Sequence, residues 1–288
     1  MGERTVDWSQ AKRALRKEVE RVARLLRSVT NPAAPALGEW SVDEVAMHLS
    51  QAWMMVPGLA RKDLSAIHEV LPGLIGTAGA SMVGDVWELG EVMQMGVRHD
   101  PERELSRLAD LIEERAREYF TDLSLSAAHD SRAWLVEGSQ VAVGTLICHL
   151  LNETVLHGWD IARGDGQRWQ INPAHAVLIL EGFLVPVIQA LDPRALVNQE
   201  QARGLRATYE LRVRGGGHHV FVFEDGALTV EAPSSRPIDC FISADPVAFL
   251  LVAWGRQNQA TAIVKRQLVV SGPQAWLGLR FRSLLRNP

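Results

Sequence analysis

The sequence has few cysteines and no long apolar run, and these shortages exclude several classes of protein. Cys148 and Cys240 are the two cysteines of a chain of 288 residues. A disulfide-rich secreted scaffold is therefore excluded, and a reducing, cytoplasmic location is expected. No uninterrupted apolar run is long enough to cross a bilayer, and the charged stretch 1–19 lacks the apolar core of a signal peptide. We therefore expect no membrane partner.

Excess charge of one sign is also missing. The chain has 30 basic and 34 acidic residues, a net charge of -4, which gives no electrostatic reason to expect a nucleic-acid partner. Its 47% hydrophobic and 22% charged residues fit a globular protein with a large core. The length suits one large or two ordinary domains.

The first part of the chain is predicted to be helical. Residues 8–29 carry an apolar stripe at helical spacing beside a basic face. A second helix is predicted to begin after Trp40-Ser41, because Ser41 and Glu44 have the spacing of a capping box and Trp40 can pack on Val45 as a hydrophobic staple. His48 follows on the apolar face of this helix.

Three further helices are predicted before residue 192. They begin at Asp100-Pro101, near residue 139, and at Asn172-Pro173, the last being strongly apolar with a kink expected at Pro186. Prolines and glycines interrupt residues 57–99, which we expect to form short helices and a long connection that rims a pocket. The polar stretch 192–204 is interpreted as a linker.

The pattern changes to period two after Gly204. Strands are predicted at 209–213, 220–224, 227–231, 238–243 and 267–270, with one helix starting at Asp245-Pro246 and a terminal helix starting at Gly272-Pro273. The sequence therefore predicts two domains, a helical one over 1–192 and an α+β one over 204–288.

The stretch 148–160 concentrates residues that bind protons or metals. On a helix, His149, Glu153, His157 and Asp160 share one face. Such groups are costly to bury without partners, and a metal would satisfy several of them at once. The two histidines lie about 12 Å apart along the helix axis, so one zinc ion cannot easily bind both.

A metal site would therefore combine Glu153 with one of these two histidines and at least one ligand from elsewhere, such as His48. The alternative is a core helix whose polar residues hydrogen-bond to neighbouring helices. His48 itself is either a buried core histidine or the missing ligand. Cys148, in the apolar run before this face, is expected to be a small buried residue.

Two motifs resemble those of a known family. Residues 40–49, WSVDEVAMHL, resemble the tryptophan–cap–helix–His-Leu signature of the maleylpyruvate isomerase-like, mycothiol-dependent enzymes, which belong to the DinB-like four-helix-bundle superfamily. Residues 153–160, ETVLHGWD, resemble the second signature, Glu-x3-His-x-Trp-Asp. The second half, with Gly255-Arg256 after an apolar helix, is similar to the family's sterol-carrier-like C-terminal domain. The resemblance implies a two-domain fold, a DinB-like helical bundle followed by an α+β sterol-carrier-like domain.

The resemblance also implies a cofactor and a reaction class. Zinc, or another divalent metal, would be bound by His48, Glu153 and His157, which selects His157 over His149. A fourth position left open is typical of catalytic zinc, and mycothiol would be the thiol cofactor or co-substrate. In the family's isomerase the thiolate adds to an activated double bond and leaves again after rotation, whereas in transferases it stays on the small electrophilic substrate.

Several other residues are candidates for the site. Arg256 either orients a substrate carboxylate through its guanidinium or caps the helix that ends at Gly255. Trp53 and Trp159 are the tryptophans expected to line the cofactor site. Asp160 either orients a metal ligand or has a capping or surface role, and His149 either lines the pocket or packs.

Two other functions compete with the thiol-dependent enzyme. One is a non-catalytic carrier that holds an apolar ligand in its C-terminal domain, and the other is a zinc hydrolase with water in the open position. The sequence leaves open the substrate, the metal, the choice between isomerase and transferase, and whether the protein is a monomer or a homodimer.

Overall fold

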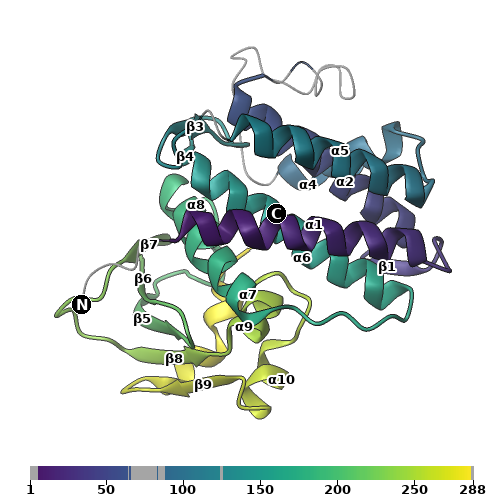
Figure 1. Ribbon diagram of the computed structural model, residues 1–288. Coiled ribbons are helices and arrows are strands. Elements are labelled where there is room, and N and C mark those ends of the chain that lie inside the picture. Colours follow the sequence, from purple (N-terminus) through teal and green to yellow (C-terminus); the bar gives the residue numbers. More distant parts are fainter. Residues whose placement is uncertain (1–5, 64, 66–82, 84–87, 124–125, 287–288) are drawn as a thin grey trace. The chain divides into compact units, whose positions relative to one another are not determined.

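The computed structural model describes residues 6–63, 65, 83, 88–123 and 126–286 (Figure 1). They form two compact units, one of residues 7–171 and one of residues 172–288 together with the N-terminal end. Most of the connection predicted within 57–99 lies outside the described residues, so the pocket rim expected there stays a prediction.

Four long helices make up the first unit. They are α1 (Trp8–Ser28), α2 (Val42–Arg61), α5 (Leu105–Asp122) and α6 (Val143–Gly164). Both α1 and α2 pack against both α5 and α6, which is the arrangement of a four-helix bundle. The shorter α4 (Glu88–His99) packs beside α2. The predicted helical bundle is confirmed.

Short antiparallel strand pairs precede the two helices α2 and α6. The first pair is β1 (Pro35–Leu37) with β2 (Trp40–Ser41), and the second is β3 (Ser131–Ala133) with β4 (Gln140–Ala142). Sequence patterns did not predict either pair, because strands of two or three residues are too short to show alternation. The pairs fix the points at which the chain enters α2 and α6.

Helix α2 begins as its sequence predicts and ends later than expected. The carboxylate of Glu44 accepts a hydrogen bond from the backbone N–H of Ser41 at 2.9 Å, which closes the predicted capping box. The helix continues through Pro57 to Arg61, so the break expected at Pro57-Gly58 is absent. Pro57 is buried in the last turns of the helix.

Helix α6 is buried along almost its whole length. Gly158 allows the ring of Trp169 to lie directly on the helix, since a Cβ atom on this glycine would lie 2.6 Å from that ring. The Arg21 guanidinium covers the same ring, 3.6 Å from its centroid. Helix α6 is therefore the central element of the bundle and can hold side chains in a dry interior.

The second unit is a mixed sheet with helices. Its strand order is β7-β6-β5-β8-β9, in which β5 and β8 are parallel and the other neighbours antiparallel. The strands are β5 (Arg206–Val213), β6 (His218–Glu224), β7 (Ala227–Glu231), β8 (Cys240–Ala244) and β9 (Leu268–Ser271), and the helices after β8 are α9 (Pro246–Ala253) and α10 (Gln259–Val264). The five predicted strands and the helix at Pro246 are confirmed.

The end of the chain differs from the predicted helix. It forms two 3-10 turns, η2 (Ala275–Leu279) and η3 (Phe281–Leu284). The Phe281 ring packs between Tyr209, Phe221 and Phe223. This anchoring favours short turns that fit the sheet over a continuous helix.

The apolar segment after Asn172 belongs to the second unit. It consists of α7 (Pro173–Ile179), a π-helical turn η1 (Leu180–Leu184) and α8 (Val185–Ala190), which pack against α9 and β7. The wide turn lies just before Pro186, as expected where a proline lacks the N–H that an α-helix needs. The units therefore divide at 171/172, whereas the sequence placed this segment in the first domain, up to 192.

This segment also bears on the membrane prediction. Among the helices of the described part of the chain, Pro173–Ala190 is the one with the length and mean hydropathy, 1.5, that a membrane span requires. Within the fold 56% of it is buried, and core helices share these properties. The stretch that follows is not a free linker, because Val197 forms a β-bridge with Leu285.

Candidate metal centre

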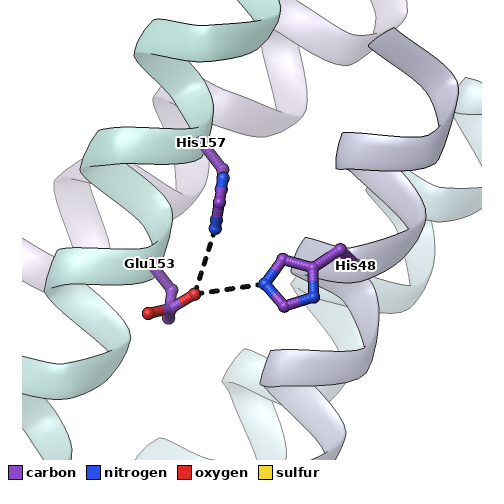
Figure 2. A group of neighbouring side chains, drawn as sticks. All are labelled: His48, Glu153 and His157. Carbon is purple, nitrogen blue, oxygen red and sulfur yellow. Dashed lines mark ion pairs between the residues drawn. The ribbon is translucent and has the colours of Figure 1, made fainter. Parts of the chain in front are cut away.

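Helices α2 and α6 bring the three predicted ligands together (Figure 2). His48 projects from α2, while Glu153 and His157 project from successive turns of α6. The Glu153 Oε2 atom lies 3.5 Å from His48 Nε2 and 3.2 Å from His157 Nε2. All three ligand atoms lie within 4.8 Å of one another, in the one such group among the residues that the structure describes.

The donor atoms fit a small divalent metal. Two ligands bound to one zinc ion at about 2.1 Å with tetrahedral angles are about 3.4 Å apart, close to both distances measured from Glu153 Oε2. Two imidazole nitrogens and one carboxylate oxygen are ligands that zinc accepts, and they leave a fourth position. The residue types and their spacing therefore fit a zinc ion with one position left open.

The three ligands are mostly buried but can still be reached. Their side chains are 9% (His48), 13% (Glu153) and 9% (His157) exposed. Burial raises the pKa of Glu153, but hydrogen bonds with His149, His157 and His48 outweigh it and hold this pKa well below its ordinary range. The carboxylate is thus anionic at neutral pH, as a metal ligand must be.

Asp160 has a defined part in this geometry. Its side chain is fully buried, and its Oδ2 lies 3.2 Å from Nδ1 of His157. Without a metal, Nε2–H of His157 can donate to Glu153 Oε2 while Nδ1–H donates to Asp160. A metal that displaced the Nε2 proton would find the Nε2 lone pair, with Nδ1–H still bonded to Asp160, which is the carboxylate–histidine arrangement found behind many metal ligands. Burial lowers the pKa of His157, but its hydrogen bonds with Asp160 and Glu153 raise it above its usual value. Of the two roles left open for Asp160, this geometry favours orienting the ligand.

His149 lies beside the group but outside it. Its Nε2 is 3.6 Å from the other carboxylate oxygen, Oε1 of Glu153, and its Nδ1 accepts a hydrogen bond from the indole N–H of Trp134 at 3.5 Å. The group of three ligands includes His157 and not His149. This agrees with the helical rise, which separates the two histidines by two turns.

Sequence reasoning missed two tryptophans at the site. The centroid of the Trp40 ring lies 5.1 Å from that of the His48 imidazole, so this residue packs on a predicted metal ligand as well as preceding the helix. Trp134 follows strand β3 and reaches His149. Trp40 stands in the first family signature and could have been included, whereas no local pattern marks Trp134.

The two tryptophans predicted to line the cofactor site have other contacts in the structure. Trp53 is fully buried, its indole N–H donates to the Thr154 hydroxyl at 3.2 Å, and its ring meets that of Tyr119 edge-on. Trp159 is partly exposed, with the Arg163 guanidinium 4.9 Å from its ring centroid. Their part in cofactor binding stays a prediction.

Arg256 belongs to the second unit, just after α9. Its Nη1 donates to the carbonyl of Trp254 at 2.9 Å, at the end of that helix. This contact corresponds to the helix-end role that the sequence left open. A role in orienting substrate stays a prediction.

Neither cysteine is suited to act as the reactive thiol. Both are free and buried. Burial raises the pKa of Cys148 to about 12 and that of Cys240 to about 11. At neutral pH both are therefore protonated, and neither supplies a thiolate.

A helical bundle with a three-ligand group, followed by a mixed α+β unit, defines the architectural class of this protein. Residues 188–286 match the model of the SCP-2 sterol transfer family, which covers most of the second unit. No curated protein sequence matches the chain significantly.

Among solved structures, the chain is similar over both units to the mycothiol-dependent maleylpyruvate isomerase. The TM-score is 0.50 with 13% identity, and 92% of each chain is covered. A histidine-to-alanine mutant of that isomerase gives a TM-score of 0.51 with 12% identity and the same coverage. The two-domain fold implied by the sequence motifs is confirmed.

Proposed function

We propose that this protein is a zinc-dependent enzyme that uses mycothiol to act on an electrophilic small molecule, as a cis-trans isomerase or an S-transferase. The observation that carries the proposal is that the ligand atoms of His48, Glu153 and His157 lie within 4.8 Å of one another. They come from two helices that are far apart in the sequence. Three protein ligands with an open fourth position are the pattern of catalytic zinc.

The chain's own residues prepare the site for a thiol. Asp160 directs the Nε2 of His157, and Glu153 supplies a negative charge that offsets part of the charge of a metal ion. When bound, zinc stabilises the thiolate form of a ligand whose thiol is otherwise mostly protonated at neutral pH. The buried cysteines supply no thiolate, so an external thiol is required.

The choice of thiol rests on similarity of fold. The solved isomerase that shares this architecture is described as mycothiol-dependent. Water in the open position would instead make the protein a zinc hydrolase. The two free, buried cysteines also agree with the reducing cytoplasm that we propose as its location.

A second candidate function is a carrier of an apolar small molecule. The match of residues 188–286 to a sterol transfer family favours it. A carrier of this kind needs no metal, so removing zinc would leave binding of an apolar ligand unchanged. The three-ligand group would then have no function, which is why the enzyme is preferred.

The test compares zinc content and thiol-dependent turnover in the wild type and two variants. We expect about one zinc per chain in the wild type, loss of zinc in His157→Ala, and no loss in His99→Ala, whose histidine is exposed on α4. Maleylpyruvate and other activated double bonds, with and without mycothiol, test turnover. Turnover that needs zinc but not the thiol would support the hydrolase. Turnover that His157→Ala retains without zinc would contradict the proposal.

A further inference from the structure

The two carboxylate oxygens of Glu153 have separate sets of neighbours. Oε2 faces the imidazole nitrogens of His48 and His157, at 3.5 and 3.2 Å. Oε1 instead accepts a hydrogen bond from Asn152 Nδ2 at 3.1 Å and lies 3.6 Å from His149 Nε2. One oxygen therefore faces the ligand group, while the other accepts a hydrogen bond from Asn152 and lies at ion-pair distance from His149.

Trp134 determines which nitrogen of His149 carries the proton. An indole N–H can only donate, so His149 Nδ1, 3.5 Å away, must accept. The remaining proton is then on Nε2, which makes this nitrogen a donor toward Glu153 Oε1. Trp134 and His149 are 4% and 6% exposed, so water competes little for these contacts.

We propose that His149, oriented by Trp134, is a positioning residue that makes Glu153 bind the metal through Oε2 alone. The inference rests on the metal site proposed above and adds a residue that controls how Glu153 binds the metal. A carboxylate that bound through both oxygens would take a further coordination position. By engaging Oε1, His149 keeps Glu153 monodentate and preserves a four-coordinate site with one position for an exogenous ligand.

The test uses three variants of His149 and Trp134 and measures zinc affinity by competition with a chromophoric chelator. His149→Leu removes the donor. We expect it to lower the affinity for zinc about 10- to 100-fold, the usual effect of losing a hydrogen bond to a metal ligand. His149→Gln, whose amide can donate to the same oxygen, should recover most of the loss. Trp134→Phe keeps an aromatic ring and removes only the N–H, so its affinity should lie between those of the wild type and His149→Leu.

Two further measurements separate positioning from general damage to the fold. In a Glu153→Ala background, His149→Leu should cause no additional loss, because His149 acts through that carboxylate. X-ray absorption at the zinc edge should detect one more oxygen ligand in His149→Leu than in the wild type. The matched control is His99→Leu, a change of the same kind at an exposed histidine, which should leave affinity unchanged.

The outcomes distinguish this inference from the proposed function. If Glu153→Ala binds zinc as tightly as the wild type, the metal site itself is refuted. If Glu153→Ala loses zinc but His149→Leu and Trp134→Phe keep wild-type affinity and coordination number, the positioning role alone is overturned. If His149→Leu does not fold, Trp134→Phe decides by the same two readouts.

Discussion

Replacing Asp160 by asparagine isolates the effect of one buried charge on the proposed metal site. Asp160 is fully buried and lies 3.2 Å from His157 Nδ1. Asparagine has nearly the same shape, and its side-chain oxygen can still accept the hydrogen bond. The substitution therefore removes the negative charge behind His157 while preserving the packing of α6.

The negative charge of Asp160 should affect zinc affinity most at a pH where the His157 imidazole is neutral. Losing an outer carboxylate costs about 10- to 100-fold in metal affinity, or about 1.4 to 2.7 kcal/mol, so zinc should bind Asp160→Asn that much more weakly near pH 8. Asp160 also helps to raise the pKa of His157, so in the wild type a proton competes with the metal as the pH falls through this pKa. Asparagine lowers the pKa and weakens that competition. The ratio of the two dissociation constants should therefore shrink from pH 8 to pH 6.

Competition titrations of zinc at pH 6, 7 and 8 would measure this ratio. The matched control is Asp110→Asn, which removes a surface carboxylate paired with Arg27 on the outside of the bundle and should not change zinc affinity. If the zinc dissociation constants of Asp160→Asn and the wild type differ by less than twofold at pH 8, the orienting role of Asp160 is refuted. A ratio that grows toward pH 6 would show that its link to the protonation of His157 has the opposite sign.

Three smaller predictions test the surrounding fold. Ser41→Ala should lower the free energy of unfolding by about 1 kcal/mol, measured with urea, because α2 loses its N-cap; no change would argue against the capping box. Gly158→Ala should cost about 1 to 3 kcal/mol, since the new Cβ would lie 2.6 Å from the Trp169 ring, and a stable variant would mean that this close contact is not needed. Cys148 and Cys240 should resist a thiol reagent at pH 8 in the folded protein, because burial raises the pKa of each to about 12 and about 11, and should both react after denaturation. Rapid reaction in the folded state would contradict their burial.

Much of the fold follows from local sequence signals. The start of α2 could be predicted because Ser41 and Glu44 have the spacing of a capping box, and the strands after Gly204 because their side chains alternate. The apolar helix after Asn172 had to be buried, but composition does not say against what. Its partners α9 and β7 come later in the chain, so its assignment to the second unit needed the tertiary structure.

The candidate site was predictable only in part. Helical spacing put Glu153 within reach of both His149 and His157 and could not choose between them; the family signature chose His157, and the structure groups the same residue with His48. Without the family signature, His48 was only a histidine on another apolar helix face, and nothing local distinguished a ligand from a core residue. The role of Trp134 depends on a hairpin between strands of three residues, which leaves no periodic pattern in the sequence.

X-ray absorption at the zinc edge, recorded on the loaded protein with and without mycothiol, tests the central claim most directly. The account predicts two imidazole nitrogens and one carboxylate oxygen in both spectra, and a sulfur at about 2.3 Å only when mycothiol is present. A spectrum that gains no sulfur, or a His48→Ala variant that retains the wild-type spectrum, would contradict it.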